Sequence, residues 1–249
     1  MTLRHIIATI SVRFSNGKRH ARSALLMAGL LVLLPACSTT QRVKDTSHTF
    51  RTVVIDAGHG GHDNGTRSRW AGSEKDAALD VARRLEPKLR EAGFKTVMTR
   101  NTDRFIPLDT RSKISNKQRN AIFVSIHFNE APRQAVSGTE LYYKSPESRA
   151  LAQVLLKNVA SVPGASSRGV RTANFHVLRV NNYPAVLVEC GYFSNPSEGG
   201  RCATPAYRER LADAIADGVF AQRFNGPRIA KASAPVPAIG LQGAVASTR

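Results

Sequence analysis

The sequence has few cysteines, few aromatic residues and few acidic residues, and each shortage excludes a class of protein. Three cysteines in 249 residues are too few for a disulfide-rich scaffold, and their spacing fits no cysteine zinc site. Aromatic residues make up 6% of the chain, and no recognisable nucleic-acid-binding module occurs. The longest apolar run, residues 24–34, is shorter than the ~20 residues that cross a bilayer. The sequence therefore predicts no nucleic-acid partner and no permanent transmembrane helix.

The shortage of acidic residues leaves a large positive charge. The chain has 36 Lys and Arg but only 18 Asp and Glu. Such a balance attracts polyanions, among them anionic lipid and anionic cell-wall polymers. The length suits one sizeable α/β domain, because two domains would each be small.

The first 36 residues have the order of a secretory signal: a basic stretch, an apolar run and a short segment before Cys37. The segment Leu34-Pro35-Ala36-Cys37 resembles the lipobox of bacterial lipoproteins, which implies lipidation of Cys37 and a membrane anchor. The alternative is an ordinary signal peptide cleaved near Ala36, which leaves Cys37 free. Both interpretations predict export to the cell envelope, and the first predicts a lipid-anchored protein that faces the periplasm.

The rest of the chain divides into a polar tether, one domain and a tail. Residues 37–50 lack an apolar period, which predicts a tether, and residues 225–249 are rich in Ala, Pro, Gly and Ser, which predicts disorder. Between them, residues 51–224 alternate strand-like and helix-like patterns. Short β-branched runs predict strands at 52–56, 95–99, 121–126, 139–143, 175–180 and 185–189.

Helical periods are expected to begin near Ser73, Ser145 and Thr204, and Pro87 is expected to kink or end the first helix. Strands alternating with helices predict an α/β fold: one three-layer domain with a mixed, mostly parallel sheet of about six strands and helices on both faces.

Three polar residues are expected to converge at the carboxyl edge of this sheet, where open α/β sheets bind ligands. His59 lies on a glycine-rich turn after the strand 52–56, and His127 follows the strand 121–126. Glu74 lies at the predicted start of the first helix. Two imidazoles and a carboxylate are a typical ligand set for catalytic zinc. Spacing alone leaves Asp56, His62 and Asp63 as competing ligands.

A further carboxylate, Glu189, directly follows the apolar strand 185–188. Burying such a group without a partner is costly. Beside a zinc site it can take a proton from water and pass it to a leaving amine. The alternative interpretation is a salt bridge to one of the many arginines.

These residues resemble the zinc-dependent N-acetylmuramoyl-L-alanine amidase family of bacterial cell walls. The resemblance spans about residues 51–222. It is carried by five motifs in order, VVIDAGHGGHDNG (53–65), SEKDAALDVARRL (73–85), MTRNTD (98–103), SIHFN (125–129) and PAVLVECGYFSNP (184–196). It implies cleavage of the amide between the muramyl lactyl group and L-alanine in peptidoglycan.

The resemblance also implies residue roles. His59, Glu74 and His127 would hold one Zn²⁺, and Glu189 would be the catalytic acid and base. Candidate substrate-binding residues are Asn129, Phe128 and Arg104; Phe128 replaces the small residue usual in the family and is expected to narrow the groove.

Some relatives carry a helical plug that an activator removes. It is inserted before the helix corresponding to residues 148–161, and Tyr143 and Ser145 leave no room for it here. We therefore expect no plug-type activator. A monomer is expected because no coiled coil or exposed apolar stripe is apparent.

Two other functions remain open. One is a different zinc hydrolase of the cell wall, a peptidase or deacetylase, although neither HExxH nor HxxEH occurs. The other is a catalytically silent lipoprotein that binds peptidoglycan, although such a domain normally lacks a ligand or the catalytic carboxylate. Cys190 and Cys202 form either a disulfide or two unpaired thiols, and unpaired thiols are the commoner outcome.

Overall fold

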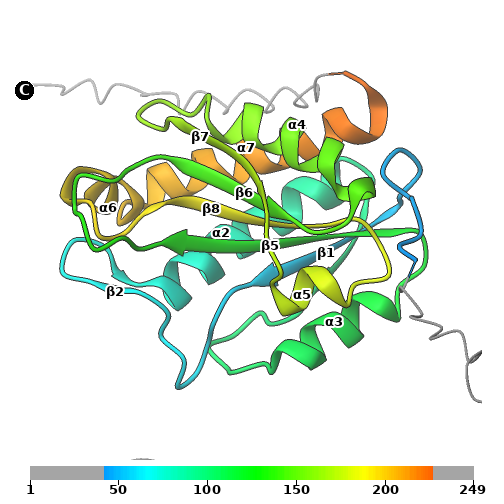
Figure 1. The fold of residues 1–249 in the computed structure, drawn as a ribbon, viewed down its shortest axis with the longest axis horizontal. Helices are drawn as coiled ribbons and strands as arrows, with labels where there is room; N and C mark the ends of the chain where they lie inside the picture. The colour runs from blue at the N-terminus through cyan, green and yellow to red at the C-terminus, as the bar shows by residue number, and fades with distance from the viewer. Residues whose placement is uncertain (1–41, 227–249) are drawn as a thin grey trace, which may run out of the picture. The chain divides into compact units, whose positions relative to one another are not determined.

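The computed structural model describes residues 42–226, and these form a sheet covered by helices on both faces (Figure 1). The six-stranded sheet has the order β4-β1-β5-β8-β6-β7. Its strands are β1 (Thr52–Ala57), β4 (Lys95–Met98), β5 (Ala121–Asn129), β6 (Thr139–Tyr143), β7 (Ser167–Thr172) and β8 (Ala185–Tyr192). A separate hairpin pairs β2 (Arg67–Ser68) with β3 (Gly72–Ser73).

Four strands, β4, β1, β5 and β8, run parallel, and their carboxyl ends meet at one edge. The other two, β6 and β7, are parallel to each other, and β6 is antiparallel to β8. The central strands are buried on both faces, which explains their continuous apolar sequences. The predicted mixed, mostly parallel sheet is therefore confirmed.

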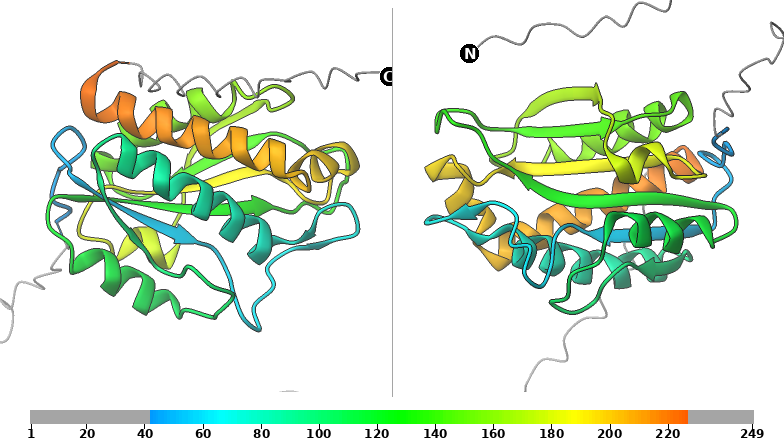
Figure 2. Two further views of the ribbon diagram at one scale, coloured as in Figure 1. Left: turned by 180° about the vertical axis from the view of Figure 1, so that it is seen from behind. Right: turned by 60° about the horizontal axis from the view of Figure 1, so that its bottom comes forward.

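Long helices cover one face of the sheet and short ones cover the other (Figure 2). The first layer contains α2 (Glu74–Glu91), α4 (Arg149–Val159) and α7 (Pro205–Phe224); the second contains α3 (Leu108–Asn116) and α5 (His176–Arg179). A 3₁₀ turn, η1 (Pro146–Ser148), precedes α4, and α6 (Pro196–Cys202) precedes α7. The larger apolar core lies under α2, α4 and α7.

One predicted strand is wrong. Residues 175–180 contain the short helix α5, which buries Val177 and Leu178 against the sheet. The sixth strand is instead β7, at the edge, where four of six residues are exposed. An edge strand that buries so little has no apolar alternation for a sequence pattern to detect.

Two further boundaries differ from expectation. Pro87 lies inside α2, which continues to Glu91. Residues of the expected tether also pack on the domain, because Phe50 is fully buried, Thr46 donates a hydrogen bond to Ala121 O (2.5 Å), and Lys44 N donates to Asn182 O (2.8 Å). The packed part of the chain therefore begins before residue 51.

The start positions of the other helices agree with expectation: Thr204 caps α7 by accepting a hydrogen bond from Tyr207 N, and Ser145 precedes η1. None of the helices within residues 42–226 is long and apolar enough to cross a membrane. The predicted signal segment, Cys37 and tail residues 227–249 lie outside the described residues.

Candidate metal centre and catalytic cleft

His59 lies on the turn that follows β1, in a backbone conformation that side chains rarely adopt. Its φ is 59°, and Gly60 and Gly61 also have positive φ values. The turn redirects the chain within three residues, so the imidazole lies over the end of the sheet. Its Nδ1 lies 2.9 Å from Asp63 Oδ2. With its proton on Nδ1, His59 presents the Nε2 lone pair to a metal.

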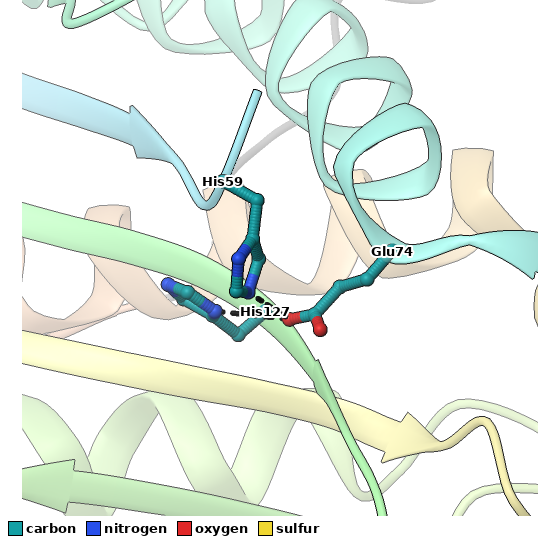
Figure 3. Close-up of side chains that lie close together, drawn as sticks. All are labelled: His59, Glu74 and His127. Atoms are coloured by element: carbon teal, nitrogen blue, oxygen red, sulfur yellow. Dashed lines mark hydrogen bonds and ion pairs between the residues drawn. The ribbon is translucent and has the colours of Figure 1, made fainter. Parts of the chain in front are cut away.

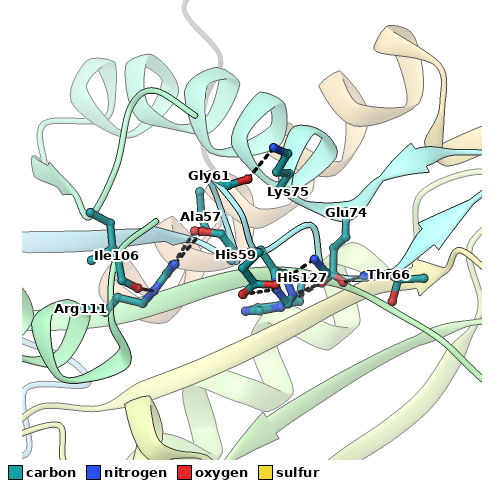
Figure 4. Close-up of polar contacts among 12 residues, drawn as sticks. Ala57, His59, Gly61, Thr66, Glu74, Lys75, Ile106, Arg111 and His127 are labelled. Carbon is teal, nitrogen blue, oxygen red and sulfur yellow. Dashed lines mark hydrogen bonds and ion pairs between the residues drawn. The ribbon is translucent and has the colours of Figure 1, made fainter. Parts of the chain in front are cut away.

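Two buried arginines hold this turn through its backbone carbonyls. Arg111 donates to Ala57 O and His59 O, each at 2.6 Å, and to Asp56 Oδ1 at 2.8 Å (Figure 4). Arg100 donates to Ala57 O (2.9 Å) and Gly58 O (2.6 Å). The strained conformation of His59 is thus fixed by contacts that surround it.

Glu74 begins α2 and is almost fully buried, with 3% of its surface exposed. Its Oε2 accepts a hydrogen bond from Thr66 N (2.9 Å), and its Oε1 accepts one from Phe128 N (3.0 Å). These amides fix the carboxylate without neutralising it. Burial alone would raise the pKa of Glu74, but hydrogen bonds with His127 and His59 outweigh it and hold that pKa well below its ordinary value.

The side chains of His59, Glu74 and His127 converge from the turn after β1, the start of α2 and the strand β5 (Figure 3). Glu74 Oε1 lies 2.9 Å from His127 Nδ1 and 3.1 Å from His59 Nε2. One ligand atom from each residue lies within 4.8 Å of the other two. The predicted His–Glu–His set is therefore brought together, and it can hold a metal ion.

Two glycines make room for this convergence. A Cβ on Gly58 would lie 2.4 to 2.7 Å from imidazole atoms of His127. A Cβ on Gly65 would lie 2.5 Å from Glu74 Oε2 and 2.8 Å from His59 Nε2. Any side chain at either position would push a candidate ligand out of place.

Glu189 points into the same region from β8. It is the Cα partner of His127 across the parallel pair β5 and β8, and its Oε2 is buried without a hydrogen-bond partner. Burial raises the pKa of Glu189 to about 7. Among the described residues, Glu189 forms no salt bridge with an arginine. The alternative interpretation of this carboxylate as an ion-pair partner is therefore not supported. A carboxyl group that changes protonation near neutral pH suits acid–base catalysis.

These groups share one cleft of about 640 Å³. Its polar lining contains the four residues above together with Asp63 and Thr66. Its apolar lining contains Phe105, Ile106, Leu108, Phe175 and Val177. A substrate in this cleft meets both acid–base groups and apolar side chains.

The candidate substrate-binding residues lie in different surroundings. Asn129 lines the cleft, and its Oδ1 accepts a hydrogen bond from Glu130 N (2.8 Å). Phe128 also lines it, but its side chain is 1% exposed and packs against Phe193 (4.6 Å between ring centroids). Arg104 is exposed beside the glycine turn and is not among the lining residues, whereas its neighbour Phe105 is.

The competing ligands have other roles. Asp56 bonds Arg111, Thr99 and Ser125 in the core, and the ring of His62 packs against Phe105 (4.3 Å). Asp63 bonds His59 Nδ1. None of the three belongs to the converging set.

Sequence reasoning missed the positioning roles of Asp63, Arg100 and Arg111 and the close contacts of Gly58 and Gly65. The glycines within residues 58–65 were a usable signal, because such density predicts close approach of other groups. Arg100 lies in the motif at 98–103, but buried arginine is rare and no sequence pattern distinguishes Arg111.

Comparison with known proteins agrees with this geometry. A family described as N-acetylmuramoyl-L-alanine amidase matches residues 53–221. The uncharacterized protein YqiI of Bacillus subtilis is 34% identical over 202 residues, which are 80% of this chain and 95% of that protein. The N-acetylmuramoyl-L-alanine amidase LytC of Bacillus subtilis is 31% identical over 221 residues, 86% of this chain but 44% of LytC.

Among solved structures, the catalytic domain of CwlV, an N-acetylmuramoyl-L-alanine amidase from Bacillus (Paenibacillus) polymyxa, superposes with a TM-score of 0.64 at 38% identity. The match covers 68% of this chain and 96% of that domain. The present chain thus spans nearly all of a relative's catalytic domain and less than half of LytC.

Proposed function

The chain belongs to the N-acetylmuramoyl-L-alanine amidase family, and from this premise we propose that it is a zinc-dependent enzyme that hydrolyses the amide between N-acetylmuramic acid and L-alanine in peptidoglycan. The observation that carries the proposal is the buried, unpartnered carboxylate of Glu189 in the cleft that holds the His–Glu–His set. Burying a carboxyl group without a hydrogen-bond partner costs folding free energy, and substrate binding alone gives no reason for that cost.

The residues fit zinc by their chemistry. His59 and His127 offer imidazole nitrogens and Glu74 offers a carboxylate oxygen, a set of three protein ligands that leaves one position open. Bound there, Zn²⁺ would polarise the scissile carbonyl and lower the pKa of water to about 7. Asp63 orients His59 by accepting a hydrogen bond from its Nδ1.

The residues of the chain perform the proton transfers. Glu189 takes a proton from the attacking water while the water oxygen forms a bond to the carbonyl carbon. It then delivers that proton to the nitrogen of L-alanine as the amide bond breaks, which releases the lactyl carboxylate and the free stem peptide. A pKa near neutrality, raised by burial, suits a group that must gain and lose a proton in one cycle.

The proposed location is the cell envelope, where peptidoglycan is found. The secretory-type N-terminus and the lipobox-like segment at Cys37 support export and lipid anchoring. Between β6, which ends at Tyr143, and η1, which begins at Pro146, only two residues connect the elements. We therefore keep the prediction that no plug at this position gates the enzyme, and a monomer is the expected state.

The test is hydrolysis of purified peptidoglycan by the full chain, with products identified by mass before and after chelation and zinc re-addition. The proposal expects stem peptides beginning with L-alanine, lost on chelation and restored by zinc. Zinc-dependent cleavage at another bond would identify a peptidase or deacetylase instead. Binding of peptidoglycan without any release would identify a silent binding protein, or an enzyme that needs an activator.

A further inference from the structure

The edge of the sheet opposite the cleft carries a group of exposed basic side chains, which we call the amino edge. Its members are Lys44, Arg51, Lys95, Lys117 and Arg119. Arg51 N bonds Asn120 O, Lys95 N bonds Arg51 O, and Lys44 N bonds Asn182 O. These bonds join the segments around Arg51, Lys95 and Asn120, and Asn182 N donates to Asn116 Oδ1 (2.7 Å), so the segments that carry the five cations are neighbours at one edge of the sheet.

None of these five cations has an acidic partner within the described residues. Lys44 lies over the ring of Tyr183, 6.0 Å from its centroid, which leaves its charge in place. Of the nearby exposed acids, Asp45 bonds the amide and hydroxyl of Ser47 (3.0 and 2.6 Å), and Glu91 ends α2. The five cations outnumber these two acids, so the amino edge carries a net positive charge.

An exposed aromatic side chain adjoins this surface. Phe224, at the end of α7, is 50% exposed, and its ring packs on Phe94, which stacks on the buried Phe50. The residue before it, Arg223, donates a hydrogen bond to Phe50 O (2.9 Å). Basic side chains around an exposed aromatic ring are the composition of surfaces that rest on lipid headgroups.

The strands fix the orientation of this edge relative to the cleft. β1 runs from Arg51 at the amino edge toward His59, and β5 runs from Arg119 toward His127. His59 and His127, which line the cleft, lie at the carboxyl ends of β1 and β5, so a flat surface that binds the amino edge leaves that end of the sheet free. The described chain also enters the domain at this edge, through Lys44.

We propose that the amino edge docks on an anionic phospholipid surface and directs the catalytic cleft away from the membrane, toward the peptidoglycan. This inference rests on the proposed location in the cell envelope and is independent of the amide chemistry. Each basic side chain close to an anionic membrane strengthens binding roughly fivefold. Because the attraction is screened over ~10 Å at 0.1 M salt, raising the ionic strength should release the surface.

The test measures lysine acetylation by mass spectrometry on the full chain reconstituted with vesicles. On phosphatidylglycerol-containing vesicles, Lys95 and Lys117 should be acetylated several-fold more slowly than Lys157, which is exposed on α4. On phosphatidylcholine vesicles, or at high salt, the three rates should be similar. Equal rates on anionic vesicles would overturn the proposal, and so would protection by soluble peptidoglycan that exceeds protection by the vesicles.

A pair of variants separates the effect of the charge on the amino edge from the effect of the general positive charge of the protein. The triple variant Lys95→Gln, Lys117→Gln, Arg119→Gln should lose the protection of Lys44 on anionic vesicles. The matched variant Arg69→Gln, Arg133→Gln, Arg210→Gln removes the same charge from exposed positions elsewhere, leaves the reference Lys157 in place, and should keep the protection of Lys44. If both behave alike, general positive charge is responsible and the amino edge is not a docking surface. Peptidoglycan hydrolysis measured on the same samples reports separately on the proposed function.

Discussion

Glu189 and His127 occupy the same register position on the neighbouring parallel strands β8 and β5. Because parallel strands end at the same edge, one register pair delivers a candidate metal ligand and the candidate acid–base group side by side. The spacing between them is set by the sheet itself, and sites on strands are held more precisely than sites on loops. The positions of these two groups therefore depend little on loop conformation, whereas His59 depends on its turn.

This pairing predicts the result of replacing Glu189 with Gln. The amide keeps the size of the side chain but cannot carry the proton, so hydrolysis should fall by about 10²–10⁴-fold while one zinc per chain stays bound. Measuring product release and metal content on the same preparation checks both the loss of hydrolysis and the retention of zinc. Glu130→Gln, at an exposed position lining the cleft, should retain activity. Full activity in Glu189→Gln would remove this residue from the mechanism.

Gly65 and Gly72 offer a matched test of ligand crowding. Both have positive φ values, 61° and 81°, but a Cβ meets Glu74 and His59 only at Gly65, whereas nothing lies within 4 Å at Gly72. Both Ala variants should lose about 1 kcal/mol from backbone strain, and Gly65→Ala should lose more because its Cβ displaces Glu74 or His59. Only Gly65→Ala should also bind zinc more weakly, measured by competition with a chromophoric chelator. Equal zinc affinity in the two variants would contradict the crowding argument.

Asp63 is expected to act on the metal through His59. Asp63→Ala removes the acceptor of the His59 Nδ1 proton and should weaken zinc binding by about 10–100-fold. The neighbouring change His62→Ala removes an imidazole that packs on Phe105 and should leave zinc affinity close to wild type. A strong loss in His62→Ala would place that residue among the ligands instead.

Asp56 and Arg111 form a fully buried ion pair (2.8 Å) beneath the His59 turn. Burial would raise the pKa of Asp56, but Arg111 and the hydroxyls of Thr99 and Ser125 outweigh it and lower that pKa below the ordinary value of 3.8. A carboxyl group whose pKa is lower in the folded state than in the unfolded state stabilises the fold at pH values above its unfolded-state pKa. This stabilisation is lost as the pH falls through its folded-state pKa.

Asp56→Asn should therefore destabilise the protein by about 3–5 kcal/mol at neutral pH. Urea unfolding of the chelated protein should show a constant difference between wild type and variant above pH 5, and the difference should shrink below pH ~3.8. A difference that grows on acidification would mean that Asp56 is protonated in the folded protein.

Cys190 and Cys202 are both buried and unbonded. Burial raises the pKa of Cys202 to about 12 and raises that of Cys190 well above its ordinary value, so neither supplies a reactive thiolate. Alkylation followed by peptide mass mapping should leave both unmodified in the folded protein and modify both after denaturation without reductant. A disulfide-linked peptide under those conditions would contradict the assignment.

The sequence predicted the site better than it predicted the helices of the second layer. His59, His127 and Glu189 each follow a strongly apolar strand, so their convergence at the carboxyl edge follows from the parallel topology. The helix α3 had no such signal, because its buried residues are polar: Arg111, Ser112 and Ser115. A helix that buries guanidinium and hydroxyl groups shows no apolar period.

At residues 175–180 the sequence predicts a strand, whereas the structure contains the helix α5. Their apolar content is real, since Val177 and Leu178 are buried, but one turn of helix buries two adjacent residues as well as a strand does. Short apolar runs cannot separate these cases. The edge strand β7 and the packing of residues 44–50 depend on neighbours distant in sequence, which no local pattern contains.

The packing of residues 44–50 joins the two ends of the domain. The side-chain amide of Gln222, in the last turn of α7, donates a hydrogen bond to Ser47 O (3.2 Å). The backbone carbonyl oxygen of Gln222 lies 3.2 Å from His48 Nδ1. A chain synthesised from its N-terminus cannot form these bonds until residue 222 has emerged, when nearly all of the domain has been made. The two ends of the domain can therefore close on each other only after almost all of it has been synthesised.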